Sequence, residues 1–180
     1  MSKFILIIVL SFLVSSEGKK VLHYNKFVNC PEHKDLPITL TYFKQHNYAK
    51  NNRTSEKKFE IKKEIKGNIE IIANMIKCDV SGAPDTCEYV VKDFKVTRVC
   101  ERMNEKGQVW TPFIEGFSPP VACPIKPGEY VTENTVNENH ALRFFPVPQG
   151  VWKASALMRN EEEILACCEI ELKILDVRRS

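Results

Sequence analysis

The sequence lacks the short motifs that carry most enzyme chemistry. It contains no Gly-x-Ser-x-Gly turn that would present a nucleophilic serine, no His-Glu-x-x-His zinc helix and no glycine-rich phosphate loop. No Cys-x-x-Cys or His-x3-His pair suits zinc. The four histidines lie apart in polar surroundings at 23, 33, 46 and 140. We therefore expect no enzyme activity, no cofactor and no metal site.

The chain also lacks a strong charge of one sign. Its 26 lysines and arginines face 23 acidic residues, which leaves a formal net charge of +3. The two signs are mixed along the chain, as on an ordinary solvated surface. This balance is too weak to predict a nucleic-acid partner or a polybasic membrane patch.

Only one apolar run is long, and it lies at the start of the chain. Lys3 precedes an apolar segment over residues 4–14, and small residues follow as far as Gly18. The run is shorter than the roughly 20 residues that cross a bilayer. We interpret residues 1–18 as a secretory signal peptide and 19–180 as one domain. The expected location is extracellular, with the lysosomal lumen as the alternative.

Seven cysteines follow that segment, at positions 30, 78, 87, 100, 123, 167 and 168. In an oxidising compartment most of them should pair. Because seven is odd, at least one thiol should stay free.

A single sequon, Asn52-Arg53-Thr54, lies in the polar stretch over residues 44–58. An Asn-x-Thr triplet in a secreted chain is an acceptor for glycosylation. We interpret the stretch as a surface loop that is glycosylated at Asn52.

Apolar and polar residues alternate with a period of two in several short segments, which is typical of β-strands with one buried face. Turns rich in glycine and proline separate these segments, and residues 159–165 are interpreted as a hairpin turn. This spacing predicts an antiparallel sandwich, barrel or cup without a long helix. The expected strands cover residues 38–43, 58–65, 68–76, 93–100, 151–158 and 163–175.

Two segments carry apolar bulk where loops are expected, over residues 109–120 and 140–152. Leaving even one phenylalanine exposed forgoes roughly 1.5–3 kcal/mol of burial. These side chains should therefore plug the ends of a sandwich or form the lip of a hydrophobic cavity.

Five landmarks in order resemble a known family. They are "FVNC" at 27–30, "FEIKKEIKGNIEI" at 59–71, the pair Cys78 and Cys87, "PPVACPIKPGEY" at 119–130, and "FFPVPQGVWKASALMRNEEEILACCEI" at 144–170. Their order and spacing resemble the ganglioside GM2 activator and its secreted insect relatives, some of them associated with chemosensory tissue. These proteins stand near the MD-2-related lipid-recognition group.

The resemblance implies a single-domain, all-β, antiparallel β-cup, sandwich-like, with a hydrophobic cavity and disulfides. It also implies a non-enzymatic binding protein for a lipid or other hydrophobic small molecule, such as a chemosensory carrier in pheromone response. One alternative is an activator that extracts glycolipid from a membrane surface for a hydrolase. Another is a secreted venom or immune interaction protein without a ligand. A receptor or hydrolase, and transiently a membrane, are the further expected partners.

The resemblance further implies a disulfide map: Cys30–Cys167, Cys78–Cys87 and Cys100–Cys123. Alternation supports the choice of Cys167, because it lies on the polar face of its segment while Cys168 lies on the apolar face. Cys168 would then be a buried free thiol that behaves as a small hydrophobe. The family's Pro-Cys-x-Cys-Pro run has only Cys123 here, so one family bridge is missing.

Two sets of residues are the candidate ligand site under this interpretation. The first shapes the mouth of the cavity: Trp110, Phe113, Phe117, Phe144, Phe145 and Val147. The second lines its interior: Ile71, Phe94, Val96, Trp152, Ala154 and Ile170.

Overall fold

The computed structural model describes residues 19–49, 52–108, 110–132 and 147–177. The expected signal peptide, residues 1–18, therefore lies outside the described residues. Nine strands occur in the described part: β1 (Lys19–Asn29), β2 (Ile38–Ala49), β3 (Asn52–Ile61), β4 (Glu70–Cys78), β5 (Glu88–Val96), β6 (Phe117–Ser118), β7 (Gly128–Thr132), β8 (Gly150–Arg159) and β9 (Ile164–Val177). The helical elements are short: the 3-10 turn η1 (Pro84–Thr86), α2 (Val99–Arg102) and α3 (Thr111–Glu115).

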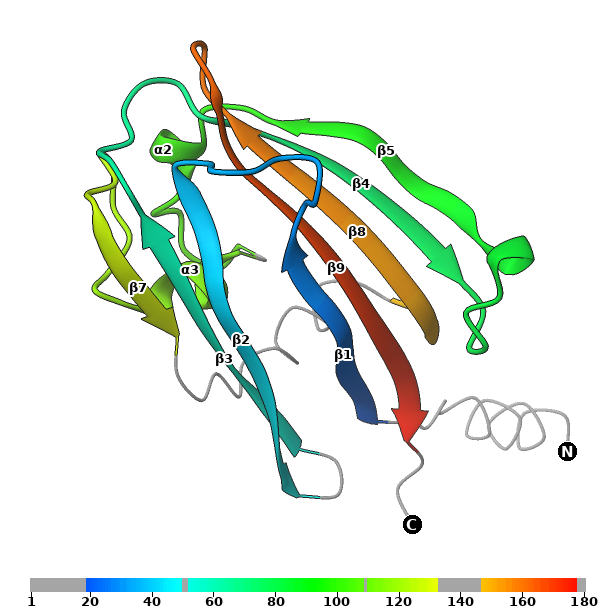
Figure 1. Ribbon diagram of the computed structural model, residues 1–180. Helices are drawn as coiled ribbons and strands as arrows, with labels where there is room; N and C mark the ends of the chain where they lie inside the picture. The colour runs from blue at the N-terminus through cyan, green and yellow to red at the C-terminus, as the bar shows by residue number, and fades with distance from the viewer. Residues whose placement is uncertain (1–18, 50–51, 109, 133–146, 178–180) are drawn as a thin grey trace, which may run out of the picture.

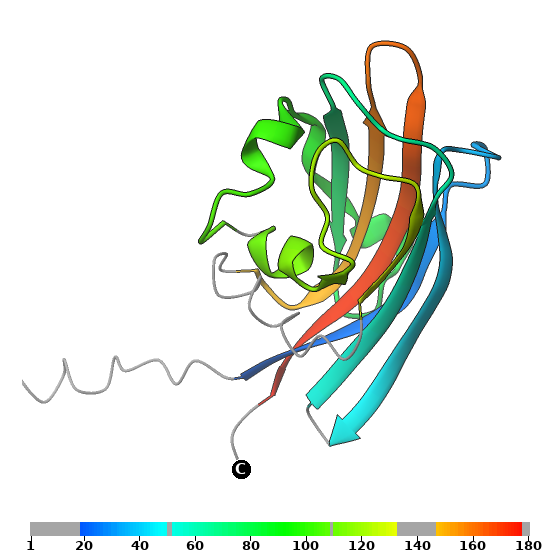
Figure 2. The same cartoon turned by 90° about the vertical axis from the view of Figure 1, so that its left-hand side faces the viewer.

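The strands form two antiparallel sheets, so the predicted all-β antiparallel class is confirmed. One sheet has the order β1-β9-β8-β4-β5 and the other the order β2-β3-β7-β6. β1 and β2 are neighbours where the two sheets meet (Figure 1). Helices α2 and α3 lie on the side of the molecule away from β2 (Figure 2). The two sheets therefore meet along β1 and β2, and the helices lie on the other side.

The hairpin of β8 and β9 illustrates how the sequence produces the large sheet. Its turn is closed by Asn160, whose Oδ1 accepts hydrogen bonds from the backbone N–H groups of Glu162 and Glu163 at 3.0 and 2.9 Å. A short polar side chain that satisfies the backbone in this way favours a turn. The hairpin turn predicted for this segment is therefore confirmed.

Three expectations about local structure are wrong. The strand expected over 93–100 ends at Val96, because Arg98 adopts a left-handed conformation (φ 55°) and starts α2. The polar stretch around Asn52 is mostly the β2–β3 hairpin rather than a loop. Part of this hairpin meets water and part of it buries polar residues, Thr54, Ser55 and Lys57, so polarity alone did not identify a loop. The strand expected over 58–65 ends at Ile61, and Ile65 forms only an isolated bridge with Ile125.

A buried core fills the end of the sandwich that contains the β8–β9 turn. Its members come from both sheets and from the segments around α2: Ile38, Ile61, Ile65, Ile69, Met103, Phe117, Ile125, Tyr130 and Leu165. The structure contains three disulfides among the described residues: Cys30–Cys167, Cys78–Cys87 and Cys100–Cys123. These are the pairs that the resemblance implied, and Cys168 is free.

Candidate functional site

The middle of the inner face of the five-stranded sheet is apolar, while Lys77 and Asn29 lie in rows toward its two ends. Residues that pair directly across strands share a face, and the register places one row at Phe94, Ala73, Ala156 and Cys168. All six residues predicted to line a cavity lie in this row or in nearby rows on the same face. Ile71 pairs with Val96, Ala154 pairs with Ile170, and Trp152 occupies the next row. Whether they contact a ligand stays a prediction.

The middle of this inner face is only half-buried, although both of its ends are buried. Leu165 at one end and Ile174 at the other are 0% and 2% exposed. Between them lies a belt of six residues in two rows, which we call the inner belt: Ala73, Met75, Ala154, Ala156, Cys168 and Ile170. Each is partly exposed. Three of the six are alanines, and small side chains leave space between sheets that pack about 10 Å apart.

Aromatic rings cross the interior from the β1–β2 side to α3. Tyr24 and Phe27 of β1 each meet Phe43 of β2 edge-on, with ring centroids 5.3 and 5.4 Å apart. The series continues from Phe27 through Phe59 to Phe117, at 6.2 and 5.7 Å. Edge-to-face contacts of this kind add to the energy of simple burial. The interior is therefore bounded by a connected aromatic layer beside the inner belt.

The predicted mouth residues occupy different environments. Trp110 precedes α3 and donates its indole N–H to the carbonyl of Arg102, at 3.3 Å. Phe113 of α3 is 45% exposed and contacts Phe117, which is itself only 8% exposed. Val147 is half-buried. Phe144 and Phe145 lie outside the described residues.

An exposed aromatic also marks the β5 edge of the five-stranded sheet. Phe94 is 58% exposed, although it pairs with Ala73 on the inner face. Phe94 and the half-exposed Phe113 therefore present apolar surface on β5 and on α3. Trp110 and Phe113 remain candidate mouth residues, and Phe94, which was predicted to line the interior, lies at the exposed edge of the sheet.

A polar group interrupts the apolar interior on β3. Lys57 is only 4% exposed, and its Nζ donates a hydrogen bond to Oγ of Ser55, which is fully buried. The same Nζ lies 5.6 Å from the centroid of the Tyr24 ring. Lys57 is two residues before Phe59 and four before Ile61, so it shares their inward face. Its burial was not expected from the sequence, although its period-two position relative to those apolar residues was a signal for it.

The free thiol of Cys168 lies in the inner belt, where desolvation raises its pKa to about 11. A thiol with a raised pKa carries little thiolate near neutral pH, and the thiolate is the reactive form. Its position makes it a native reporter of the interior.

We expect Cys168 to react slowly with a disulfide reagent such as dithionitrobenzoate at pH 7.5, and faster as the pH rises toward 11. The reason is that the thiolate fraction grows about tenfold per pH unit below the thiol pKa. The rate constant is followed by absorbance in folded protein, with the Cys168→Ala variant as blank. Fast reaction at pH 7.5, at the rate of a free thiol in solution, would contradict this assignment.

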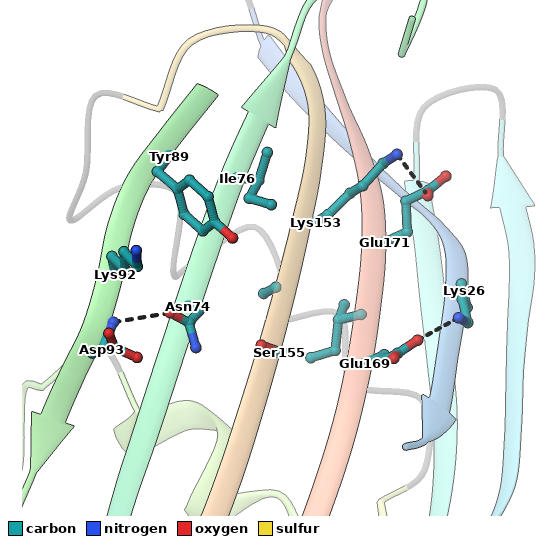
Figure 3. Close-up of a pocket in the computed structure, with 12 residues that line it drawn as sticks. Lys26, Asn74, Ile76, Tyr89, Lys92, Asp93, Lys153, Ser155, Glu169 and Glu171 are labelled. Atoms are coloured by element: carbon teal, nitrogen blue, oxygen red, sulfur yellow. Dashed lines mark hydrogen bonds and ion pairs between the residues drawn. The ribbon is translucent and has the colours of Figure 1, made fainter. Parts of the chain in front are cut away.

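A shallow depression on the other face of the large sheet has a different character (Figure 3). Four of its charged side chains form ion pairs, Lys26 with Glu169 at 2.5 Å and Lys153 with Glu171 at 3.9 Å, and Lys92 lies over the Tyr89 ring instead. Tyr89, another of its residues, is 60% exposed. Exposed ion pairs of this type contribute little to stability, and the depression offers no apolar enclosure.

Among the described residues, one group of possible metal ligands lies close together: Cys30, Glu32 and Cys167. Both sulfurs belong to a disulfide and so cannot act as thiolate ligands. No described helix is both long and apolar enough to cross a membrane.

No family model matches the sequence, and no curated protein matches it. Among solved structures, the chain is similar to a Niemann-Pick type C2 protein from Japanese carpenter ant. The two share 14% sequence identity, the match covers 82% of this chain and 98% of that chain, and the TM-score is 0.37. This overlap is too loose to assign a family, so the fold class rests on the strands, sheets and disulfides themselves.

Proposed function

We propose that this protein is a secreted, non-enzymatic carrier that holds a lipid or another hydrophobic small molecule between its two sheets. The observation that carries the proposal is the inner belt, which is apolar, rich in alanine and half-buried. The sequence landmarks that resemble the MD-2-related lipid-recognition group support the same function independently.

The energetics favour such a ligand. Apolar side chains that stay half-exposed inside a sandwich forgo part of their burial energy, and an apolar ligand would recover it. Each buried CH2 group is worth about 0.8 kcal/mol. A single long hydrocarbon chain on the ligand therefore supplies enough burial energy to offset the cost of ordering the ligand and the residues around it.

The variant Ala156→Phe tests the proposal by filling the space over the inner belt. We expect it to weaken binding of a fluorescent apolar probe such as 1-anilinonaphthalene-8-sulfonate or N-phenyl-1-naphthylamine at least tenfold, while the thermal unfolding temperature is unchanged or higher. The matched control is Ser155→Phe, which adds the same ring to the outer face of the same strand and should leave binding unchanged.

The opposite pattern would contradict the proposal. If the inner face were tightly packed, Ala156→Phe would overpack it and cost about 1–3 kcal/mol of stability. Wild-type protein would then also fail to bind the neutral probe.

Within this function we propose soluble carriage, of the chemosensory type that the resemblance implied, over extraction of glycolipid from membranes. The depression on the outer face has paired charges, and the net charge is only +3. Weak charge of this kind provides little attraction to anionic bilayers. Co-sedimentation with anionic vesicles measures the difference: carriage predicts little bound protein, and membrane extraction predicts strong binding.

A further inference from the structure

Lys57 lies in a row of four residues that spans the smaller sheet. The register pairs Phe43 with Lys57, Lys57 with Thr132, and Thr132 with Phe117. Directly paired residues present their side chains on the same face, with Cβ atoms about 4.5–5.5 Å apart. Phe43 and Phe117 belong to the interior aromatic layer. Lys57 and Thr132 are therefore two polar side chains placed next to each other between aromatic residues, with the buried Ser55 beside Lys57.

Thr132 supplies an independent sign that something polar is bound there. It is 1% exposed, and its Oγ1 meets no hydrogen-bond partner in the part of the chain that the structure describes. A buried hydroxyl without a partner costs about 1–3 kcal/mol, and such groups are uncommon in folded proteins. A hydrogen-bond acceptor on a ligand would satisfy it.

We propose that Lys57 and Thr132 bind the anionic head of a single-chain amphiphile, a carboxylate or a phosphate monoester, inside the sandwich. This inference rests on the proposed function and adds the chemical class of the ligand. The ammonium group of Lys57 supplies positive charge, and the Thr132 hydroxyl donates a hydrogen bond to an oxygen of the head. Hydrogen bonds to a charged group are roughly twice as strong as neutral ones.

The position of Lys57 also fits the rest of such a molecule. Its ammonium lies over Tyr24 of β1, and Tyr24 pairs with Leu172 beside the inner belt. From β1 the sheet continues through β9, β8 and β4 to β5. Four spacings of about 4.8 Å give a path of roughly 19 Å across the inner face. An extended acyl chain can follow this path from Lys57 toward the exposed Phe94.

The test compares three ligands of equal chain length: hexadecanoate, hexadecyl phosphate and the neutral 1-hexadecanol. Their affinities are measured by displacement of N-phenyl-1-naphthylamine from wild-type protein and from Lys57→Met, Thr132→Val and Lys58→Met. Lys58→Met is the matched control, because Lys58 is the next residue on β3 and faces Tyr42, away from Lys57. Circular dichroism establishes that each variant is folded.

We expect wild-type protein to bind at least one anion about tenfold more tightly than the alcohol. Lys57→Met should lose that preference and keep its affinity for the alcohol, Thr132→Val should lose part of it, and Lys58→Met should keep it. The anion that responds identifies the head group. Equal binding of all three ligands by the wild type would overturn this inference and leave the carrier function standing. If Lys57→Met does not fold, an unchanged preference for the anion in Thr132→Val would have the same meaning. Failure of all three ligands to bind would refute the carrier function itself.

Discussion

Replacing Cys30 and Cys167 together by serine is expected to lower the free energy of unfolding by about 5 kcal/mol. The two residues are 137 positions apart, so their disulfide closes nearly the whole domain into one loop. In the chain-entropy model the stabilisation grows with the logarithm of loop length, and a loop of this size gives about 5 kcal/mol. Both residues are changed because Cys168 lies next to Cys167 and would offer a lone Cys30 a new partner.

The matched control is the double variant at Cys78 and Cys87, which are only 9 positions apart. The same model gives this short loop about 2.5 kcal/mol. Denaturant unfolding under non-reducing conditions measures both. Equal losses for the two variants would contradict the entropic explanation, and a small loss at Cys30 and Cys167 would show that the β1–β9 pairing holds that strand without the bridge.

The substitution Gly150→Ala is expected to be the most damaging single change of a small residue. Gly150 begins β8 with φ at +149°, a conformation that residues with a side chain rarely adopt. A Cβ at this position would overlap the backbone carbonyl oxygen of Cys78 on the neighbouring strand. Backbone atoms cannot rotate away, so β4 and β8 would have to separate. We expect a loss of about 2–6 kcal/mol, from strain and overpacking together.

Gly128→Ala separates these two causes. Gly128 has nearly the same φ, +147°, but a Cβ there would meet no atom within 4 Å. Its substitution should cost only the conformational strain, about 1–3 kcal/mol. Chemical denaturation of both variants gives the comparison. If Gly128→Ala were as destabilising as Gly150→Ala, the close approach to Cys78 would not be the cause.

Much of the fold could be predicted because its signals are local. Period-two alternation located β8 and β9, and its continuation through residues 159–165 into the final strand predicted the hairpin turn between them. Secondary structure was harder to predict for residues whose conformation depends on partners distant in sequence. β1 is a strand because β9 lies beside it, and the polar β2–β3 hairpin is held by cross-strand pairing rather than by an apolar face. β5 ends close to Arg98, whose left-handed backbone conformation is not predicted by the residue types around it.

The candidate site shows the same division. The strand residues proposed for its lining, such as Ala154 and Ile170, followed from alternation, and the register brings them together. Lys57 was not recognised, because a lysine between other charged residues is normally solvated. Its ammonium lies over the ring of Tyr24 on β1, which is distant in sequence and becomes a neighbour only when the sheets meet.

Native mass spectrometry of the secreted protein, followed by organic extraction, tests the central claim most directly. Carriage predicts a protein mass increased by one small apolar molecule, which the extract then identifies. For a preparation that has lost its ligand, it predicts a one-to-one complex after incubation with hexadecanoate or 1-hexadecanol. A protein that shows only its own mass, both as secreted and after both incubations, would contradict the claim that the space between the sheets holds a hydrophobic ligand.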